Sequence, residues 1–185
     1  MGRTLLALAV LGALGYAATR PRPTPTRKKS GNGSVEPGTV VDSGTIGTQG
    51  GMMSWQVLTG DAAGTFLARW RMGETGNYTL LRVVPSDAGS PILVFPSVDM
   101  AKAGLRLAAG TALDAGTTFA QGVRVTPSGT AAWRMVYESA GSIVVQTKQP
   151  SEDKYTVLRD GNGNVAVFAN VADAWSAIQA AFPSA

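Results

Sequence analysis

The stretch Lys154–Phe182 reads KYTVLRDGNGNVAVFANVADAWSAIQAAF, and it repeats the pattern of an earlier stretch, Asn77–Ala109, which reads NYTLLRVVPSDAGSPILVFPSVDMAKAGLRLAA. The segment YTVLR at 155–159 matches YTLLR at 78–82 at four of five positions. In both stretches a Val-Phe pair follows, with a further valine three residues after the phenylalanine. Recurrence of this kind is the signature of a supersecondary unit that occurs more than once. We therefore predict that an internal duplication sets the fold.

Two tryptophans extend the match upstream. Trp133 lies 22 residues before Tyr155, and Trp55 lies 23 residues before Tyr78. Each interval contains an Ala-Gly pair, and small residues of this kind mark turns between strands. The duplicated unit therefore reaches back at least to each tryptophan.

Each unit is predicted to contain four strands and one helix. Runs rich in aromatic and β-branched residues, separated by glycine-containing turns, predict the strands. Ser97 and Asn170 are good helix N-caps, and the apolar spacing that follows each of them predicts one helix in each unit. The predicted strands are 53–58, 65–72, 77–84 and 92–95 in the first unit and 133–138, 142–148, 154–159 and 164–168 in the second.

The two units span 52–110 and 129–182, each in the order ββββα. A unit of this order exposes one apolar sheet face and a short helix, so that two copies cover each other. We expect an α+β domain over 52–185, with antiparallel sheets in two pseudo-symmetric repeats related by a twofold axis. A further strand is predicted over Phe119–Val125 and has no counterpart in the first unit. Asp160–Gly163 is predicted to be a hairpin turn, because it lacks the bidentate glutamate of a calcium loop.

The composition disfavours several classes of enzyme. The chain contains no cysteine, which excludes disulfides, thiolate catalysis, zinc-thiolate sites and lipoprotein acylation. It contains no histidine either, and histidine is the usual general base near neutral pH. No convincing carboxylate pair, serine with a base or glycine-rich phosphate loop is recognisable. We expect a non-enzymatic protein without a catalytic residue, cofactor or metal.

An apolar segment lies at the start of the chain. Thr4–Thr19 is an uncharged run of 16 residues, near the short end of the roughly 17 to 25 that span a bilayer. It fits a retained single-pass membrane anchor over 1–19, and also a cleaved signal peptide or a buried core helix. Basic residues flank it: Arg3, Arg20, Arg22, Arg27, Lys28 and Lys29. Because the flank after the segment is the more basic one, we expect the following domain on the cytoplasmic side.

Residues 20–51 are predicted to be a linker. Its first part, 20–30, alternates proline with polar and basic residues, which indicates an extended spacer suited to anionic lipid headgroups. Its second part, 31–51, is rich in glycine, serine and threonine and is predicted to be a flexible tether. The formal net charge of +4 lies entirely in residues 1–51, because residues 52–185 carry ten basic and ten acidic groups.

The junction between the last strand and the capped helix reads VFPSV in the first unit and VFANV in the second. With this junction, the duplicated ββββα order over roughly residues 52–182 resembles the whirly and Pur families of single-stranded nucleic-acid-binding proteins. The resemblance implies a whirly-like fold and an affinity for single-stranded nucleic acid.

Aromatic side chains beside cations on strands are the means by which sheets hold unpaired bases. The residues that fit this description are Arg69, Trp70, Arg71, Tyr78, Arg82, Arg134, Tyr155 and Arg159. The same residue types also serve sheet packing, and a neutral domain gains little from a phosphate backbone. We therefore expect weak nucleic-acid binding by the domain, with any affinity located in the basic tail.

The leading hypothesis is a membrane-anchored structural protein whose domain docks onto other proteins, either capsid proteins or further copies of itself. A setting that fits is the virion of a membrane-containing bacteriophage, in which a minor protein links the membrane to the capsid on a topologically cytoplasmic side. The alternative is a membrane-tethered single-stranded nucleic-acid-binding protein of whirly-like fold. A third hypothesis is a secreted or periplasmic adhesion module released by signal cleavage.

Overall fold

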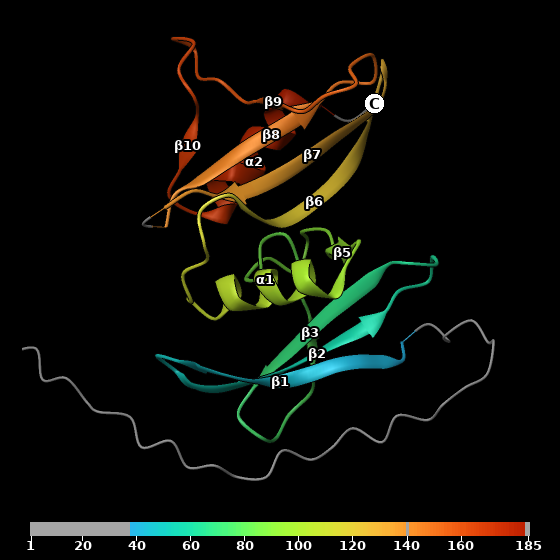
Figure 1. Ribbon diagram of the computed structural model, residues 1–185, viewed down its shortest axis with the longest axis vertical. Helices are drawn as coiled ribbons and strands as arrows, with labels where there is room; N and C mark the ends of the chain where they lie inside the picture. The colour runs from blue at the N-terminus through green and yellow to red at the C-terminus, as the bar shows by residue number, and fades with distance from the viewer. Residues whose placement is uncertain (1–37, 140, 184–185) are drawn as a thin grey trace, which may run out of the picture. The chain divides into compact units, whose positions relative to one another are not determined.

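The computed structural model of the protein describes residues 38–139 and 141–183 (Figure 1). Every described residue belongs to one compact unit, Ser34–Ala185. The predicted membrane segment 4–19 and its basic flanks lie outside the described residues. Within the described ranges, no helix combines the length and the apolar character needed to cross a bilayer.

The described chain contains the same series of elements twice. In the first half, β1 spans Val40–Thr48, β2 Gly51–Thr59, β3 Phe66–Met72, β4 Thr79–Leu80, β5 Val94–Phe95 and α1 Val98–Ala108. In the second half, β6 spans Thr117–Thr126, β7 Gly129–Tyr137, β8 Ile143–Lys148, β9 Thr156–Val157, β10 Val167–Phe168 and α2 Val171–Ala181. Each repeat is therefore five strands followed by one helix, one strand more than the sequence pattern predicted.

The strand order of the two sheets is the same. The first sheet runs β1-β2-β3, with β4 and β5 both on the far side of β3, and the second runs β6-β7-β8, with β9 and β10 both on the far side of β8. All pairs are antiparallel. The short strands share one neighbour, because β4 pairs with Arg69 and Trp70 while β5 pairs with Phe66 and Leu67. The α+β class with two antiparallel sheets is thus confirmed.

The strand β1 corrects the predicted boundary of the domain. Residues 31–51 were predicted to be a flexible tether, yet Val40–Thr48 forms a nine-residue strand paired with β2. β1 is the counterpart of β6, so the strand predicted over Phe119–Val125 does have a partner in the first repeat. The two strands even share a register shift, between Val40 and Asp42 in β1 and between Thr118 and Ala120 in β6.

A glycine opposite a tryptophan explains why β1 was missed. Gly44 pairs with Trp55, and Gly122 pairs with Trp133. In both repeats the indole lies across the glycine, so that a Cβ on the glycine would stand 2.7 Å from the indole Cζ2. Low β-propensity at this position is therefore a consequence of packing and does not indicate a loop.

The helices begin as predicted. Ser97 Oγ accepts a hydrogen bond from the Met100 backbone N–H at 3.2 Å, and Asn170 Oδ1 accepts one from the Asp173 backbone N–H at 2.9 Å. Both caps have extended backbone conformations, which is the geometry of an N-cap. α1 ends before Gly110, whose φ of +77° suits glycine.

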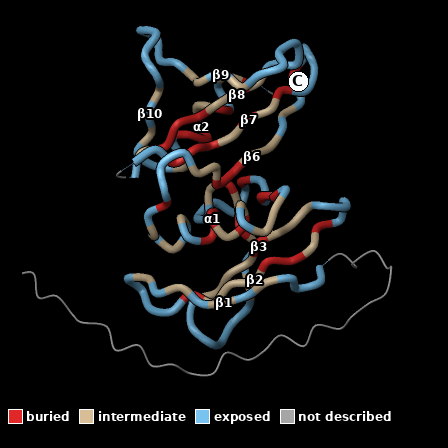
Figure 2. Tube along the Cα trace, viewed as in Figure 1, coloured by how far each residue is buried: buried red, intermediate tan, exposed pale blue. Residues whose placement is uncertain are grey.

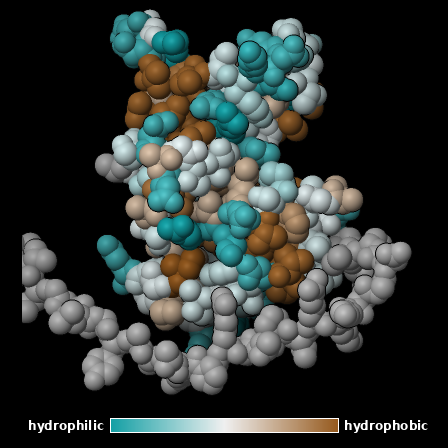
Figure 3. Space-filling view, viewed as in Figure 1, coloured by the Kyte–Doolittle hydropathy of each residue, from teal (hydrophilic) through white to brown (hydrophobic). Residues whose placement is uncertain are grey.

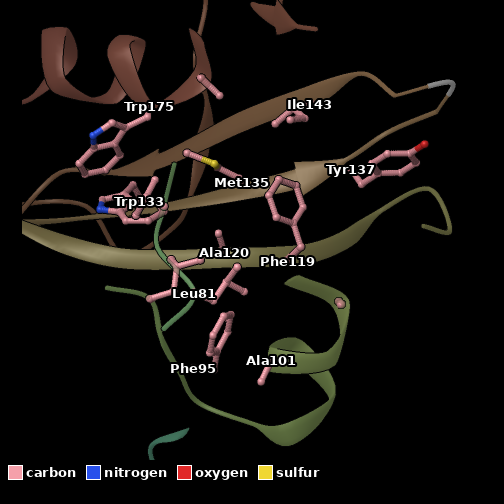
Figure 4. Close-up of a cluster of buried hydrophobic side chains, with 14 of the residues drawn as sticks. Leu81, Phe95, Ala101, Phe119, Ala120, Trp133, Met135, Tyr137, Ile143 and Trp175 are labelled. Atoms are coloured by element: carbon pink, nitrogen blue, oxygen red, sulfur yellow. The ribbon is translucent and has the colours of Figure 1, made fainter. Parts of the chain in front are cut away.

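Each helix covers one face of its own sheet, which we call the inner face. Lys102 of α1 lies over the Trp55 ring, with Nζ 6.0 Å from the ring centroid, and Trp175 of α2 packs edge-on against Trp133 at 5.3 Å. The buried side chains of both inner faces belong to one continuous cluster, which Figure 4 shows on both sides of β6. The two repeats therefore share a single core (Figure 2).

The repeats meet in a head-to-tail manner. α1 contacts β6 of the second repeat as well as β2, β3 and β5 of its own sheet, whereas α2 contacts only β8 and β10 to a comparable extent. A twofold axis would require an equally extensive contact between α2 and β1, and no contact of that extent joins these two described elements. The predicted twofold relation is therefore wrong, although the repeated unit itself is confirmed.

Candidate functional site

The outer face of each sheet, turned away from its helix, holds the side chains with the most chemical interest. In the first sheet, Gln56 of β2 stands opposite Arg69 of β3, next to Arg71. In the second sheet, Arg134 of β7 stands opposite Gln146 of β8. The face follows from the strand alternation, because the intervening residues point into the core.

On the first sheet, two arginines hold one tyrosine. The guanidinium carbons of Arg69 and Arg71 lie 4.9 Å and 4.7 Å from the centre of the Tyr78 ring. Arg69 also donates from Nε and Nη2 to Gln56 Oε1, at 2.8 Å and 2.6 Å. Arg71 Nη1 donates to the Gly76 carbonyl at 3.3 Å. The tyrosine thus sits within cation–π distance of two positive charges.

The second sheet builds the same cluster from exchanged positions. Arg134 Nε donates to Gln146 Oε1 at 2.7 Å, and its guanidinium carbon lies 4.4 Å from the centre of the Tyr155 ring. The arginine is on the middle strand here, whereas in the first sheet it is on the following strand. Arg and Gln thus exchange strands between the two sheets, and the Arg–Gln–Tyr cluster is preserved. The cluster therefore requires an arginine opposite a glutamine, on either of the two strands.

The arginines and tyrosines of these clusters were predicted as site residues, but Gln56 and Gln146 were not. The glutamines could have been found from the residue that follows each tryptophan. Gln56 follows Trp55, and Arg134 follows Trp133, so aligning the repeats would have shown the exchange.

Three of the predicted nucleic-acid contacts do not join these clusters. Trp70 lies on the inner face, because it pairs with Trp55 and packs against the core. Arg82 Nη1 donates to the carbonyl of Ser90. Arg159 Nη1 donates to the carbonyl of Gly163 at 2.6 Å. Both arginines therefore fix the loop that follows their own strand.

The outer faces also expose apolar side chains at equivalent places. Val94 of β5 and Val167 of β10 are 48% and 59% exposed, and each stands opposite an outer-face residue of the neighbouring strand. These valines were not among the predicted site residues. The exposed outer-face apolar residues are Val40, Met52, Ile92 and Val94 in the first repeat and Val123, Val125, Val165 and Val167 in the second. In Figure 3, apolar side chains gather over the region of β10.

The outer faces of the described strands carry cations and no acidic residue. The outer faces carry the cations Arg69, Arg71, Arg134 and Lys148. The described strands contain one acidic residue, Asp42, which lies on an inner face and bonds to Lys102 Nζ at 3.1 Å. The remaining acidic groups of the described residues lie in turns and helices. The outer faces are therefore locally cationic and partly apolar.

Two hollows of the surface lie between the repeats. One cavity of ≈ 220 Å³ is lined mostly by apolar residues, among them Leu81, Gly104 and Phe119. A second of ≈ 350 Å³ includes Ser90 and Arg124. Ser90 Oγ donates to backbone carbonyls of its own loop, and Arg124 Nε donates to the Phe182 carbonyl. Neither hollow joins a nucleophile to a base.

The turn at Asp160 serves its own backbone. Asp160 Oδ1 accepts hydrogen bonds from the backbone N–H groups of Asn164 and Asn162, both at 2.9 Å, and these bonds lower the pKa of the Asp160 carboxyl. The hairpin is closed by an antiparallel bridge between Arg159 and Val165, which confirms the predicted turn. Among the residues that the structure describes, no group of three or more acidic side chains is placed to hold a metal ion.

No family model, curated protein or solved structure matches this chain. The resemblance to the whirly and Pur families therefore remains a prediction from the order of elements.

Proposed function

We propose that this chain is a non-enzymatic interaction protein, held at a membrane by residues 4–19, whose two-sheet domain binds other proteins through its outer faces. The observation that carries the proposal is the recurrence of exposed apolar residues at equivalent outer-face positions, Val94 and Val167. Neither valine contributes to the core, because each side chain points away from the helix that covers its sheet. Linking a viral membrane to a capsid is one setting that fits a tethered module of this kind.

The electrostatics favour a protein partner over a polyanion. The described residues contain ten basic and eleven acidic groups, so the domain has no surplus of positive charge to release counterions from a phosphate backbone. The outer-face cations are local, and Arg69 and Arg134 are already bonded to glutamine side chains. Apolar area bordered by a few charges is typical of a specific protein interface.

Site-specific photo-crosslinking tests this proposal. A photoreactive amino acid is placed in the full chain at Val94 or Val167, and at Ala180 as a control, because Ala180 is exposed on α2 away from the outer faces. After irradiation in the native assembly, we expect a discrete protein adduct from both valine positions and none from Ala180. Adducts of equal yield at all three positions, or adducts to nucleic acid alone, would contradict the proposal.

A second function is favoured by one specific observation. The aromatic ring of Tyr78 lies beside two guanidinium groups, and aromatic and cationic side chains on a sheet are what single-strand binding uses. Binding of a single-stranded oligonucleotide is therefore to be compared between the wild-type domain from Ser34 and its Tyr78→Ala and Arg69→Ala variants at two salt concentrations. We expect weak, salt-sensitive binding. Tight binding that both variants abolish would put the nucleic-acid function first.

A further inference from the structure

We propose that the free edge of β1, over Ser43–Gly47, pairs with the same edge of a second copy of this chain. β1 is the outermost strand of its sheet, and no described residue pairs with its other edge. The Ser43 N–H bonds to Asp42 Oδ1 at 2.8 Å and not to β2. Because alternate residues of an antiparallel strand point the same way, the backbone groups of Ser43, Thr45 and Gly47 face away from β2.

The equivalent edge of β6 is protected, and the edge of β1 is not. At the start of β6, α1 stands against the strand at Phe119, the residue equivalent to Val41 of β1, and the Phe119 carbonyl oxygen is 3.2 Å from the place of a Gly104 Cβ. Further along β6, Arg124 points to the inner face and bonds to Phe182, and an inward-pointing charge is a common protection of an edge strand. In β1 the position equivalent to Arg124 is Ile46, which is uncharged.

The two halves of β1 also differ in how well they are protected against pairing with another strand. Its first half has a register shift after Val40 and the inward-pointing Asp42, which bonds to Lys102. Both features discourage pairing at that end. The second half, from Ser43 to Thr48, contains no charged residue and no proline. It is therefore an open template for a further strand.

A second copy of β1 fits this template. An antiparallel pair centred on Thr45 places threonine opposite threonine, Ser43 opposite Gly47, and Gly44 opposite Ile46. Threonine pairs across strands are favourable, and no like charges face each other. The contact is self-complementary, so it closes into a twofold dimer and cannot grow into a fibre. It would join the first sheets of the two copies into one continuous sheet.

Because the chain has no cysteine, a single introduced thiol reports this contact without ambiguity. The full chain carrying Thr45→Cys is oxidised under mild conditions, and Val123→Cys, at the equivalent position of β6, is the matched control. Paired Cα atoms at the centre of an antiparallel pair are about 5.5 Å apart, which suits a disulfide. We expect disulfide-linked dimers from Thr45→Cys at least about tenfold faster than from Val123→Cys, because pairing raises the effective concentration of the thiols.

A charge at the same position tests the contact without oxidation. Thr45→Lys places two like charges opposite each other across the twofold axis, and we expect the dimer dissociation constant in sedimentation experiments to rise at least about tenfold. At a protein concentration low enough for both proteins to be monomeric, the melting temperature of the Thr45→Lys variant should match that of the wild type. This measurement separates loss of pairing from loss of folding. Equal crosslinking of the two cysteine variants, an unchanged dissociation constant, or a wild type that stays monomeric would overturn the proposal.

Discussion

The two repeats share every element and differ in what covers the second face of their helix. In α1 this face is apolar and lies against β6; its residues are Met100, Ala103, Gly104 and Leu107. In α2 the equivalent residues are Asp173, Ser176, Ala177 and Ala180, which are exposed or half-buried. The helix of the first repeat is thus covered on two faces, whereas the helix of the second repeat has one covered face and one polar, solvent-exposed face. Tandem repeats end in this way because an uncovered apolar helix face is insoluble.

The largest expected effect comes from removing β1. A chain that starts at Met52 loses the strand that pairs with the whole of β2, whereas a chain that starts at Ser34 keeps it. We expect the longer chain to unfold cooperatively in a thermal melt followed by circular dichroism, and the shorter chain to show no cooperative transition. Equal melting of the two chains would mean that β1 is not part of the repeat.

Alanine substitutions at equivalent positions of the two helices should differ strongly in their effect on the free energy of unfolding. Trp175 of α2 and Lys102 of α1 each follow the first helical residue by four positions. Trp175→Ala removes a buried ring that packs on Trp133, and should lower the free energy of unfolding by about 3 to 5 kcal/mol. Lys102→Ala breaks an ion pair with side chains 42% and 35% exposed, and should cost less than about 1 kcal/mol. Chemical denaturation of both variants gives the comparison.

A similar cost at both positions would contradict the described packing, since it would mean that the two inner faces depend equally on the helix residue at this position.

The glycines beneath the tryptophans should differ by a smaller amount. A Cβ would stand 2.7 Å from the indole in both Gly44→Ala and Gly122→Ala. Trp133 is 3% exposed and held by Trp175, so Gly122→Ala should cost about 2 to 3 kcal/mol, as overpacked cores do. Trp55 is only half-buried and can shift, so Gly44→Ala should cost about 1 kcal/mol.

Gly47→Ala is the control for this pair, because nothing lies within 4 Å of its Cβ position. Urea titration should find it within about 0.5 kcal/mol of the wild type. If Gly44→Ala were equally silent, the indole would not lie across β1 as described.

The smallest expected effect compares Gly104 of α1 with Ala177 of α2. Alanine is favoured over glycine in an exposed helix by about 1 kcal/mol, so Ala177→Gly should lower stability by about that amount. Gly104→Ala should also lower it, because the new Cβ meets Leu81, Phe95 and the Phe119 carbonyl, each at 3.2 Å. A stabilised Gly104→Ala variant in the same titration would show that α1 is not pressed against β6.

The sequence predicted most of the repeat because its signals were local. The strand-to-helix junctions, the caps at Ser97 and Asn170 and the turn at Asp160 each follow from neighbouring residues, and all are confirmed. β1 escaped prediction because its glycines and threonines suit a strand only where an indole lies across Gly44, and this contact is between strands.

The site was predictable to a similar degree. The tyrosines and arginines of the Arg–Gln–Tyr clusters were identified, but the glutamines were not, and strand alternation places Trp70 on the other face. The head-to-tail contact of α1 with β6 depends on how the repeats are oriented, and no pattern within one repeat contains that information.

Amide hydrogen exchange of β1 tests the central claim most directly, because the claim is that both halves of the chain contain the same five-stranded sheet and hence equivalent outer faces. The N–H groups of Gly44 and Ile46 point toward β2, as those of Gly122 and Arg124 point toward β7. In dilute full-length protein, we predict slow exchange at all four amides, against fast exchange at Gly47. Fast exchange at Gly44 and Ile46, with Gly122 and Arg124 still protected, would contradict the account.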